Sequence, residues 1–416
     1  HSMTVKIKNS QDFIDLENLY GAHNYHPLPV VLEKGEGVFV WDVEGKKYYD
    51  FLSAYSAVNQ GHSHPKLVNA LIEQAQKLAL TSRAFYNSKL GEYEKKITSL
   101  FGFDKVLPMN SGAEAVETAI KLARKWSYEV KGISDGYAKI IVCENNFHGR
   151  TTTIVSFFFD KDANNNFGPF TPGFIRIPYN DIESLEKILE DEAQHIAAFM
   201  VEPIQGEAGV YVPNEGFLKK ASELCKKYNV LFVADEVQTG IARTGKLIAC
   251  HHEDVQPDIL ILGKALSGGM YPVSAVLANN EIMNVIHPGQ HGSTFGGNPL
   301  ACAVAMAALD VVIDENLSER AEKLGIIFRN EINKIIEKTD LIYKVRGKGL
   351  LNAILVNDSP ESSTAWNICL KLAENGLLAK PTHGNIIRLA PPLVITEEQL
   401  MECVLIIEEV ILSYSI

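Results

Sequence analysis

The chain has 416 residues, of which 46% are hydrophobic and 22% are charged. This length and composition are ordinary for a globular protein and predict two or three domains with an ample core. The formal net charge of −12 argues against nucleic acid or an anionic membrane surface as the main partner. No apolar run reaches the roughly 18 residues of a membrane-spanning helix, so we expect no membrane partner.

Cysteine usage indicates a reducing environment and no metal centre. Six cysteines are scattered without a C-x-x-C pair or a cluster with histidine, a pattern typical of reduced thiols. Adjacent side chains such as His251 and His252 rarely converge on one ion, so we expect no metal site there. The first methionine, Met3, is not followed by a basic, serine-rich segment, and we therefore expect a cytoplasmic protein.

The N-terminal part, residues 1–61, is expected to be largely irregular. A short polar helix and a stretch rich in proline and aromatic residues precede a hairpin expected at 38–42 and 47–51. Tyr25 and Tyr55 lie in this part of the chain. Taken singly, each tyrosine is explained by packing, because this amphipathic side chain is often half-buried.

A helix over residues 116–126 is preceded by a possible anion site. Ser111 and Glu114 match a capping box. Gly112 and Ala113 have almost no side chain, so the free N–H groups of the first turn are open to an anion. An ordinary helix cap explains the same residues.

Polar residues follow the next two expected strands. The strand at 139–143 precedes Phe147, which could stack on a ring, and Arg150, which could bind a carboxylate through both arms of its guanidinium. Glu202 and Glu207 follow the strand after it. Core packing, a surface ion pair or solvated carboxylates explain these residues equally well when each is read alone.

Two more strands carry the most informative pair. Apolar residues 230–234 lead to Asp235, and residues 259–262 lead to Lys264, which lies 29 positions after that aspartate. One strand–crossover–strand unit fits this spacing and places both side chains at the carboxyl edge of one parallel sheet. A lysine that faces an aldehyde and a carboxylate that faces a pyridine nitrogen are the contacts that pyridoxal phosphate needs. Read alone, Lys264 is better explained as a solvated lysine in a strand-to-loop turn, since most lysines are exposed.

The C-terminal part begins after a Gly-rich loop whose Ser293 and Thr294 could contact a phosphate or belong to a flexible connection. A long helix over 317–338 then leads to one strand expected at 345–356. We expect three parts: an N-terminal segment (1–61) that packs with the small domain, a large cofactor-binding domain (62–315) and a small α+β domain (316–416).

The sequence resembles the class III pyridoxal-phosphate aminotransferases of fold type I from about Tyr20 to the C-terminus. The stretches ADEVQTGIARTGK and LGKALSGGMYPVSAV carry the likeness to the class. YGAHNYHPLPV and LLAKPTHGNIIRLAPPLVI resemble its ornithine branch. The resemblance implies an α/β fold with a large domain around a mostly parallel seven-stranded sheet wrapped by helices. A smaller α+β domain from the N- and C-terminal segments completes it.

The resemblance also implies roles around pyridoxal phosphate. Lys264 would bind the cofactor covalently and move the proton, and Asp235 would pair with the ring nitrogen. Gln238 would lie near the ring oxygen, and Phe147 would stack on the ring face. Phosphate contacts are implied for Ser111, Gly112, Ala113 and, from the neighbouring subunit of a homodimer with shared active sites, Ser293 and Thr294.

Amino acid and 2-oxo acid substrates would occupy the rest of the site. Their contacts are implied for Tyr25, Tyr55, Arg150, Glu202, Glu207 and Arg388. Tyr25 and Arg150 would hold the α-amino and α-carboxylate groups of ornithine, and Tyr55 would line the pocket. Glu207 would pair with Arg388 while ornithine is bound and release it for the carboxylate of 2-oxoglutarate.

The implied reaction transfers the δ-amino group of ornithine to 2-oxoglutarate, as a step of ornithine, arginine and proline metabolism. His148 is one departure, since some animal members have Trp there, and it weakens the likeness to the branch but not the chemistry. Open alternatives are an aminotransferase for acetylornithine or 4-aminobutyrate, a glutamate-1-semialdehyde aminomutase and a non-enzymatic scaffold. A nicotinamide oxidoreductase is disfavoured, because no G-x-G-x-x-G follows a first strand.

Overall fold

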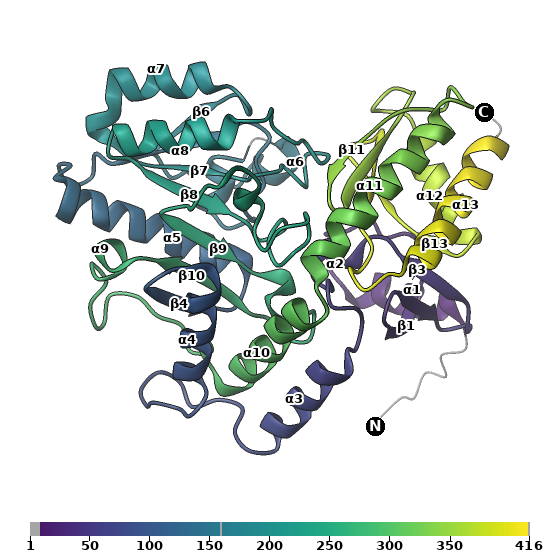
Figure 1. The fold of residues 1–416 in the computed structure, drawn as a ribbon, viewed down its shortest axis with the longest axis horizontal. Coiled ribbons are helices and arrows are strands. Elements are labelled where there is room, and N and C mark those ends of the chain that lie inside the picture. The colour runs from purple at the N-terminus through teal and green to yellow at the C-terminus, as the bar shows by residue number, and fades with distance from the viewer. Residues whose placement is uncertain (1–8, 159, 415–416) are drawn as a thin grey trace.

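The computed structural model describes residues 9–158 and 160–414. The start at His1-Ser2-Met3 lies outside the described residues. Two bodies of unequal size lie side by side (Figure 1). The larger body surrounds a central sheet, and the smaller one combines the C-terminal helices with strands from both ends of the chain.

The central sheet has the strand order β4-β10-β9-β8-β7-β5-β6. Its strands are β4 (Lys105–Met109), β5 (Lys139–Cys143), β6 (Phe174–Ile177), β7 (Ile196–Val201), β8 (Leu231–Asp235), β9 (Ile259–Leu262) and β10 (Ser274–Ala278). Every neighbouring pair is parallel except the two that β10 forms with β4 and β9. The expected mostly parallel seven-stranded sheet is therefore confirmed.

Helices cover both faces of this sheet because its strands are apolar on both faces. In β5, Ile140 and Val142 pack into one cluster, whereas Ile141 and Cys143 pack into the other. The helices of this body are α3 (Pro65–Ala75), α4 (Leu90–Phe101), α5 (Gly112–Trp126), α6 (Lys161–Asn164), α7 (Ile182–Glu192), α8 (Phe217–Lys227), α9 (Asn280–Met283) and α10 (Pro299–Asp314). Helices α5 and α9 lie on the second cluster, and α4, α7, α8 and α10 lie on the first.

Two smaller four-stranded sheets build the other body. One has the order β1-β2-β3-β13 and the other β11-β12-β15-β14. Their strands are β1 (Leu32–Glu36), β2 (Phe39–Asp42), β3 (Lys47–Asp50), β11 (Ile342–Lys348), β12 (Leu351–Val356), β13 (Leu377–Leu378), β14 (Lys380–Thr382) and β15 (Ile386–Leu389). The helices are α1 (Ser10–Tyr20), α11 (Leu317–Ile336), α12 (Thr364–Glu374) and α13 (Glu397–Ser413). Because β3 pairs in parallel with β13, the N-terminal hairpin and the C-terminal region share one sheet.

The single strand expected at 345–356 is wrong. The segment forms two antiparallel strands, β11 and β12, with Lys348 opposite Leu351. Between them, Gly349 has a φ of +56°, which only glycine adopts without strain, and the chain reverses there. Apolar residues follow Gly349, but basic residues and a second glycine precede it, so no pair of apolar runs marks the hairpin in the sequence.

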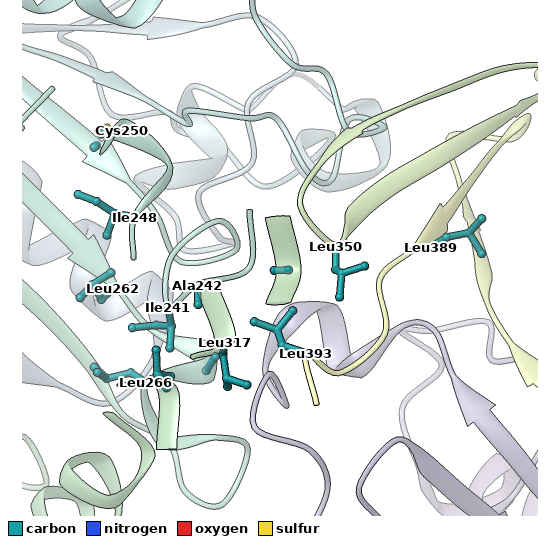
Figure 2. Packing of buried hydrophobic residues seen from close by; sticks show 14 of the residues in the cluster. Ile241, Ala242, Ile248, Cys250, Leu262, Leu266, Leu317, Leu350, Leu389 and Leu393 are labelled. Atoms are coloured by element: carbon teal, nitrogen blue, oxygen red, sulfur yellow. The ribbon is translucent and has the colours of Figure 1, made fainter. Parts of the chain in front are cut away.

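One hydrophobic cluster continues from the large body into the small one. Figure 2 shows Ile241 and Leu262 on the side of the central sheet and Leu350, Leu389 and Leu393 on the side of the C-terminal sheet. The cluster therefore fixes the two bodies relative to each other, with the carboxyl edge of the central sheet facing the C-terminal strands.

Arg243 joins three segments at this junction. Its side chain is fully buried, and Nη1 donates to the backbone oxygens of Leu350, at 2.9 Å, and Pro391, at 2.5 Å. Nη2 donates to the Oδ1 atom of Asn59 at 2.7 Å. Burial lowers the pKa of Arg243 to about 9, and the positive charge of Arg388 contributes to this shift. Neutral oxygens, rather than a carboxylate, thus hold the guanidinium.

We expect the substitution Arg243→Met to destabilise the protein. The substitution leaves three buried oxygen atoms without their donor, at about 1–3 kcal/mol each, and the removal of a desolvated charge offsets part of this. The expected loss is about 2–5 kcal/mol of unfolding free energy, measured by scanning calorimetry as a lower melting temperature. Lys323→Met, at a side chain that is 74% exposed, is the matched control. Equal melting temperatures for the two variants would contradict the role of Arg243.

Candidate active site

The carboxyl ends of β8 and β9 bring the predicted aspartate and lysine together. Asp235 ends β8, and Lys264 begins the 3-10 helix η5 (Lys264–Ser267) directly after β9. The strands are parallel neighbours, with Asp235 opposite Ile261. A cavity of about 210 Å³ lies at this edge. Six of the residues expected to contact a cofactor line it: Lys264, Asp235, Gln238, Phe147, Gly112 and Ala113.

The Lys264 amine is prepared to act as a nucleophile or base. Burial lowers the pKa of Lys264 to about 8, and the charge of Arg388 lowers it further, whereas Glu207 and Asp235 act in the opposite direction. The Nζ atom lies 5.4 Å from the centroid of the Tyr55 ring. About a tenth of the amine is therefore neutral near pH 7, far more than for a surface lysine.

His148 supports Asp235. The imidazole Nδ1 atom lies 2.6 Å from Oδ2 of Asp235, and the backbone N–H of Val237 donates to Oδ1 at 3.0 Å. Both the histidine and the aspartate are buried, and the Nε2 atom of His148 has no hydrogen-bond partner in the described structure. The sequence did not reveal this contact, because β7 lies between the strands that carry the two residues.

Glu202 lies in the cavity wall beside Asp235. Its Oε1 atom accepts a hydrogen bond of 2.9 Å from the backbone N–H of Phe147. Burial raises the pKa of Glu202 well above its ordinary value, and the charge of Asp235 raises it further. In this position, Glu202 holds the loop that presents the Phe147 ring to the cavity.

The N-terminus of α5, where the sequence predicts an anion site, lies at the cavity. Ser111 Oγ accepts from the backbone N–H of Glu114 at 3.2 Å, and Glu114 Oε1 accepts from that of Ser111 at 3.1 Å. The hydroxyl therefore completes a capping box, and it is Gly112 and Ala113 that line the cavity. A Cβ atom added at Gly112 would lie 3.2 Å from Val237, so the wall is tight here. Unpaired first-turn N–H groups favour an anion at this place.

The substrate residues expected from the sequence gather beside this cavity, around Tyr55. Burial raises the pKa of the Tyr55 hydroxyl, and the nearby Glu207 and Tyr25 raise it further. The positive charges of Arg388 and Arg150 lower it. Glu207, Tyr25, Arg388 and Arg150 thus all lie near enough to the Tyr55 hydroxyl to shift its pKa, although the side chain of Tyr25 is 74% exposed.

Two arginines flank the cavity. The guanidinium carbon of Arg150 lies 5.7 Å from the centroid of the Phe147 ring, and that of Arg388 lies 5.6 Å from the centroid of the Tyr55 ring. Glu207 lines an adjoining cavity of about 440 Å³. A dicarboxylate, or an amino acid with its α-carboxylate, can therefore meet a cation beside Phe147 or beside Tyr55.

Arg388 has neutral partners in the described structure. Nη1 donates to Oε1 of Gln238 at 2.5 Å, and Nη2 donates to Oγ of Ser56 at 2.8 Å. The direct ion pair with Glu207 that the resemblance implies for the ornithine complex is not formed in the described structure, where the Nε atom of Arg388 has no hydrogen-bond partner. Burial lowers the pKa of Arg388 to about 10, and the nearby Glu207 acts in the opposite direction.

Tyr55 and Ser56 are presented by an unusual turn, α2 (Ser53–Ser56). The φ values of its four residues run from +50° to +75°, so the turn is left-handed although it contains no glycine. Each such residue costs about 1–2 kcal/mol relative to the right-handed conformation. Conformations of this kind persist where the surroundings fix them, and they are frequent at functional sites.

Ser293 and Thr294 are not brought into this cavity by their own chain. Ser293 Oγ accepts a hydrogen bond of 2.9 Å from the amide nitrogen of Asn110 and lines a different cavity. Within residues 9–158 and 160–414, no group of three or more histidine, cysteine, aspartate or glutamate side chains could hold a metal ion. None of the helices in these ranges has the length and apolar character needed to cross a bilayer.

Comparison with known proteins identifies the family. Residues 20–411 match the profile described as Aminotransferase class-III. This chain is a class-III aminotransferase. The aminotransferase is 64% identical over 397 residues to the mitochondrial ornithine aminotransferase of Drosophila melanogaster. The aligned region covers 95% of this chain and 90% of the Drosophila protein.

Two solved structures are also similar to this aminotransferase. The acetylornithine aminotransferase from Elizabethkingia anophelis is 80% identical, has a TM-score of 0.91 and covers 98% of this chain and 100% of its own. The ornithine aminotransferase from Toxoplasma gondii ME49 is 50% identical and has a TM-score of 0.95. The match covers 98% of this chain and 96% of the Toxoplasma chain. Both similarities extend over the whole fold.

The cofactor of the aminotransferase is pyridoxal phosphate, and the described residues fit it. The cavity offers a supported carboxylate, an amine of lowered pKa, an aromatic wall and a helix N-terminus for the phosphate. When bound, the cofactor supplies an aldehyde that carries the amino group and a ring that withdraws electrons. Asp235 would keep the ring nitrogen protonated, and Phe147 would cover the ring.

The lowered pKa of Lys264 predicts the pH dependence of cofactor attachment. Only the neutral amine attacks an aldehyde, and this form accumulates as the pH rises through about 8. The rate at which cofactor-free protein reacts with pyridoxal phosphate should rise about tenfold between pH 7 and pH 9 and then level off. Stopped-flow absorbance measures this rate, with Lys264→Ala as the unreactive control. A rate that still rises about tenfold between pH 8 and pH 9, as expected for an ordinary lysine, would contradict the lowered pKa.

Proposed function

We propose that this aminotransferase transfers the δ-amino group of L-ornithine to 2-oxoglutarate. Glutamate-5-semialdehyde leaves after the first half-reaction and glutamate after the second. The observation that carries this proposal is the placement of two arginines near the cofactor cavity, Arg150 beside Phe147 and Arg388 beside Tyr55. The ornithine aminotransferases among the relatives support the same substrate.

The charges explain how one site can take both substrates. Ornithine carries its α-carboxylate far from the reacting amine, where Arg150 can bind it and Tyr25 can contact the α-amino group. The reacting end has no carboxylate, so the cation at Arg388 must be compensated, and Glu207 is the acidic residue whose charge reaches it. 2-Oxoglutarate brings its own carboxylate to Arg388.

The proton transfer falls to Lys264. Its Nζ atom is the amine in the cavity, and its lowered pKa leaves it partly neutral at pH 7. It can therefore accept a proton from the amine-bearing carbon and return it on the cofactor side. Tyr55 lies beside the amine, with its ring centroid 5.4 Å from Nζ.

The bound cofactor reports the first half-reaction. Its absorbance near ~420 nm should disappear when L-ornithine alone is added to the purified protein and return with 2-oxoglutarate. Absorbance that ornithine leaves unchanged would refute ornithine as the substrate. Lys264→Ala, which lacks the amine, is the control that should show no such cycle.

Acetylornithine is the second candidate substrate, because the structure that is 80% identical is described as an acetylornithine aminotransferase. The acetyl group removes the positive charge of the α-amino group and adds bulk at the end that Tyr25 would contact. Comparing kcat/KM for ornithine and N-acetylornithine separates the two. Preference for the acetylated compound would support this second candidate.

The substitution Tyr25→Phe tests the contact with the α-amino group. A hydrogen bond to a charged group is worth about 1.5–3 kcal/mol, so kcat/KM for ornithine should fall about 10- to 100-fold. 5-Aminopentanoate, which lacks the α-amino group, should be used within about twofold of wild type. Tyr20→Phe, at a side chain that is 81% exposed, is the matched control. Equal losses for both substrates would refute the contact.

We also propose a homodimer in which Ser293 and Thr294 of each chain contact the phosphate held by the other. Ser293 and Thr294 do not line the cavity of their own chain, and the side chains of Phe85, Tyr86 and Phe295 are exposed. Both observations support this assembly, which sedimentation in solution would test. A cytoplasmic location is proposed as well, supported by six free, buried cysteines, and cell fractionation would test it.

We propose the domain division expected from the sequence. The parts are residues 1–61, residues 62–315 and residues 316–416. The pairing of β3 with β13 supports an N-terminal segment that packs with the small domain, and α10 ends next to the second boundary. Limited proteolysis that cuts first at other positions would contradict these boundaries.

A further inference from the structure

The left-handed turn α2 is continuous and internally bonded. All four residues, Ser53 to Ser56, have positive φ, and the backbone N–H of Ala57 donates to the backbone oxygen of Ser53 at 2.8 Å. Ala54 is exposed, whereas Ser53 and Ser56 are buried. The sequence here has no glycine to make this conformation easy, so the surroundings must hold it.

Asp50 holds the start of the turn. Its Oδ1 atom accepts hydrogen bonds from the backbone N–H groups of Leu52, at 2.9 Å, and Ser53, at 2.8 Å. Its Oδ2 atom lies 2.7 Å from Nε2 of His62. One buried carboxylate at the end of β3 thus fixes two backbone groups and is itself fixed by an imidazole.

His62 is locked in place by two glycines. Its backbone forms an antiparallel bridge with Gly37, through hydrogen bonds of 2.8 and 3.0 Å. A Cβ atom added at Gly35 would lie 2.9 Å from the Cβ atom of His62, so only glycine leaves room for the imidazole. The support of Asp50 is therefore rigid.

The turn is also bonded to the strand that carries Arg388. Ser53 Oγ donates to the backbone oxygen of Ala390 at 2.7 Å. The backbone N–H of Ala390 in turn donates to the backbone oxygen of Phe51 at 2.7 Å. Ala390 lies two residues after Arg388. The turn and the guanidinium consequently occupy one rigid unit, within which Ser56 Oγ accepts from Nη2 of Arg388.

The partners of Arg388 have a chemical consequence. Ser56 and Gln238 offer neutral oxygens, so they orient the guanidinium without cancelling its charge. A carboxylate in either place would neutralise the cation and weaken its attraction for an incoming anion. Orientation with retained charge is what an arginine needs to bind the carboxylate of a 2-oxo acid.

We propose that Ser56 is a positioning residue for the 2-oxo acid, held in place by Asp50 and the left-handed turn. Its hydroxyl fixes Arg388 in the orientation that receives the carboxylate of the second substrate. The proposal deepens the proposed function and rests on it for the identity of that substrate. It assigns no role to Ser56 in the reaction of ornithine.

The substitution Ser56→Ala separates the two substrates. Without the hydroxyl, the guanidinium loses one of its two fixed acceptors, and KM for 2-oxoglutarate should rise about tenfold. The rate and the apparent affinity of the ornithine half-reaction should stay within about twofold of wild type. The dissociation constant of glutarate, an unreactive dicarboxylate, should rise by the same factor as KM in calorimetric titration of the holoenzyme.

Ser127→Ala is the matched control. Ser127 is equally buried, and its hydroxyl donates to the backbone oxygen of Arg124 within the helical region, away from Arg388. This variant should change neither KM nor the affinity for glutarate. Asp50→Asn is a second test of the support, since its amide cannot accept the same set of hydrogen bonds as the carboxylate. It should weaken glutarate binding and lower the melting temperature.

Two results would overturn the proposal: unchanged glutarate affinity in Ser56→Ala, or equal losses for ornithine and 2-oxoglutarate. The failure of the proposed function is distinguishable from either result. In that case, wild-type protein would not respond to ornithine, while the titration with glutarate would still compare wild type with Ser56→Ala. If Asp50→Asn does not fold, Ser56→Ala still decides the question.

Discussion

The parallel pairing of β8 with β9 is the constraint on which the site depends. It places a carboxylate and an amine at adjacent strand ends, Asp235 and Lys264, inside one closed edge of the sheet. Burial there lowers the proton affinity of the amine, and His148 holds the carboxylate. Neither group would have this chemistry at a surface position. The hydrophobic cluster that continues into the small body holds the C-terminal strands opposite this edge.

Buried positive charge is the second theme of the structure. Arg243 and Arg388 are both fully desolvated, each lacks a carboxylate at hydrogen-bond distance, and both are held by neutral oxygens. The cost of burying Arg243 is offset by three hydrogen bonds that join the two bodies. Burying Arg388 also costs free energy, and its positive charge is not neutralised by a protein carboxylate. A carboxylate of the substrate can compensate this charge. Stability and recognition therefore use the same kind of arrangement for different ends.

The sequence predicted those parts of the site that follow from strand ends and helix caps. Asp235, Lys264 and the Ser111 cap are of this kind, because apolar runs and local spacing locate them. The contacts of His148 with Asp235 and of Ser56 with Arg388 join residues 87 and 332 positions apart, and no local pattern encodes them. Four left-handed residues without glycine give no signal either, since tertiary contacts impose them. The sequence does not reveal the hairpin of β11 and β12, because only the residues after its glycines form an apolar run and basic residues precede them.

The hydrogen bond between Ser53 and Ala390 also affects the order in which parts of the chain fold during synthesis. The two residues lie 337 positions apart, and β3 likewise cannot pair with β13 until the C-terminal region has been synthesised. A nascent chain can form the central sheet with Asp235 and Lys264 before Arg388 and Ala390, the partners of the turn α2, have been synthesised. Such non-local closure is slow, and it comes last. A truncated product would thus retain the carboxylate and the amine but lack the arrangement that selects the second substrate.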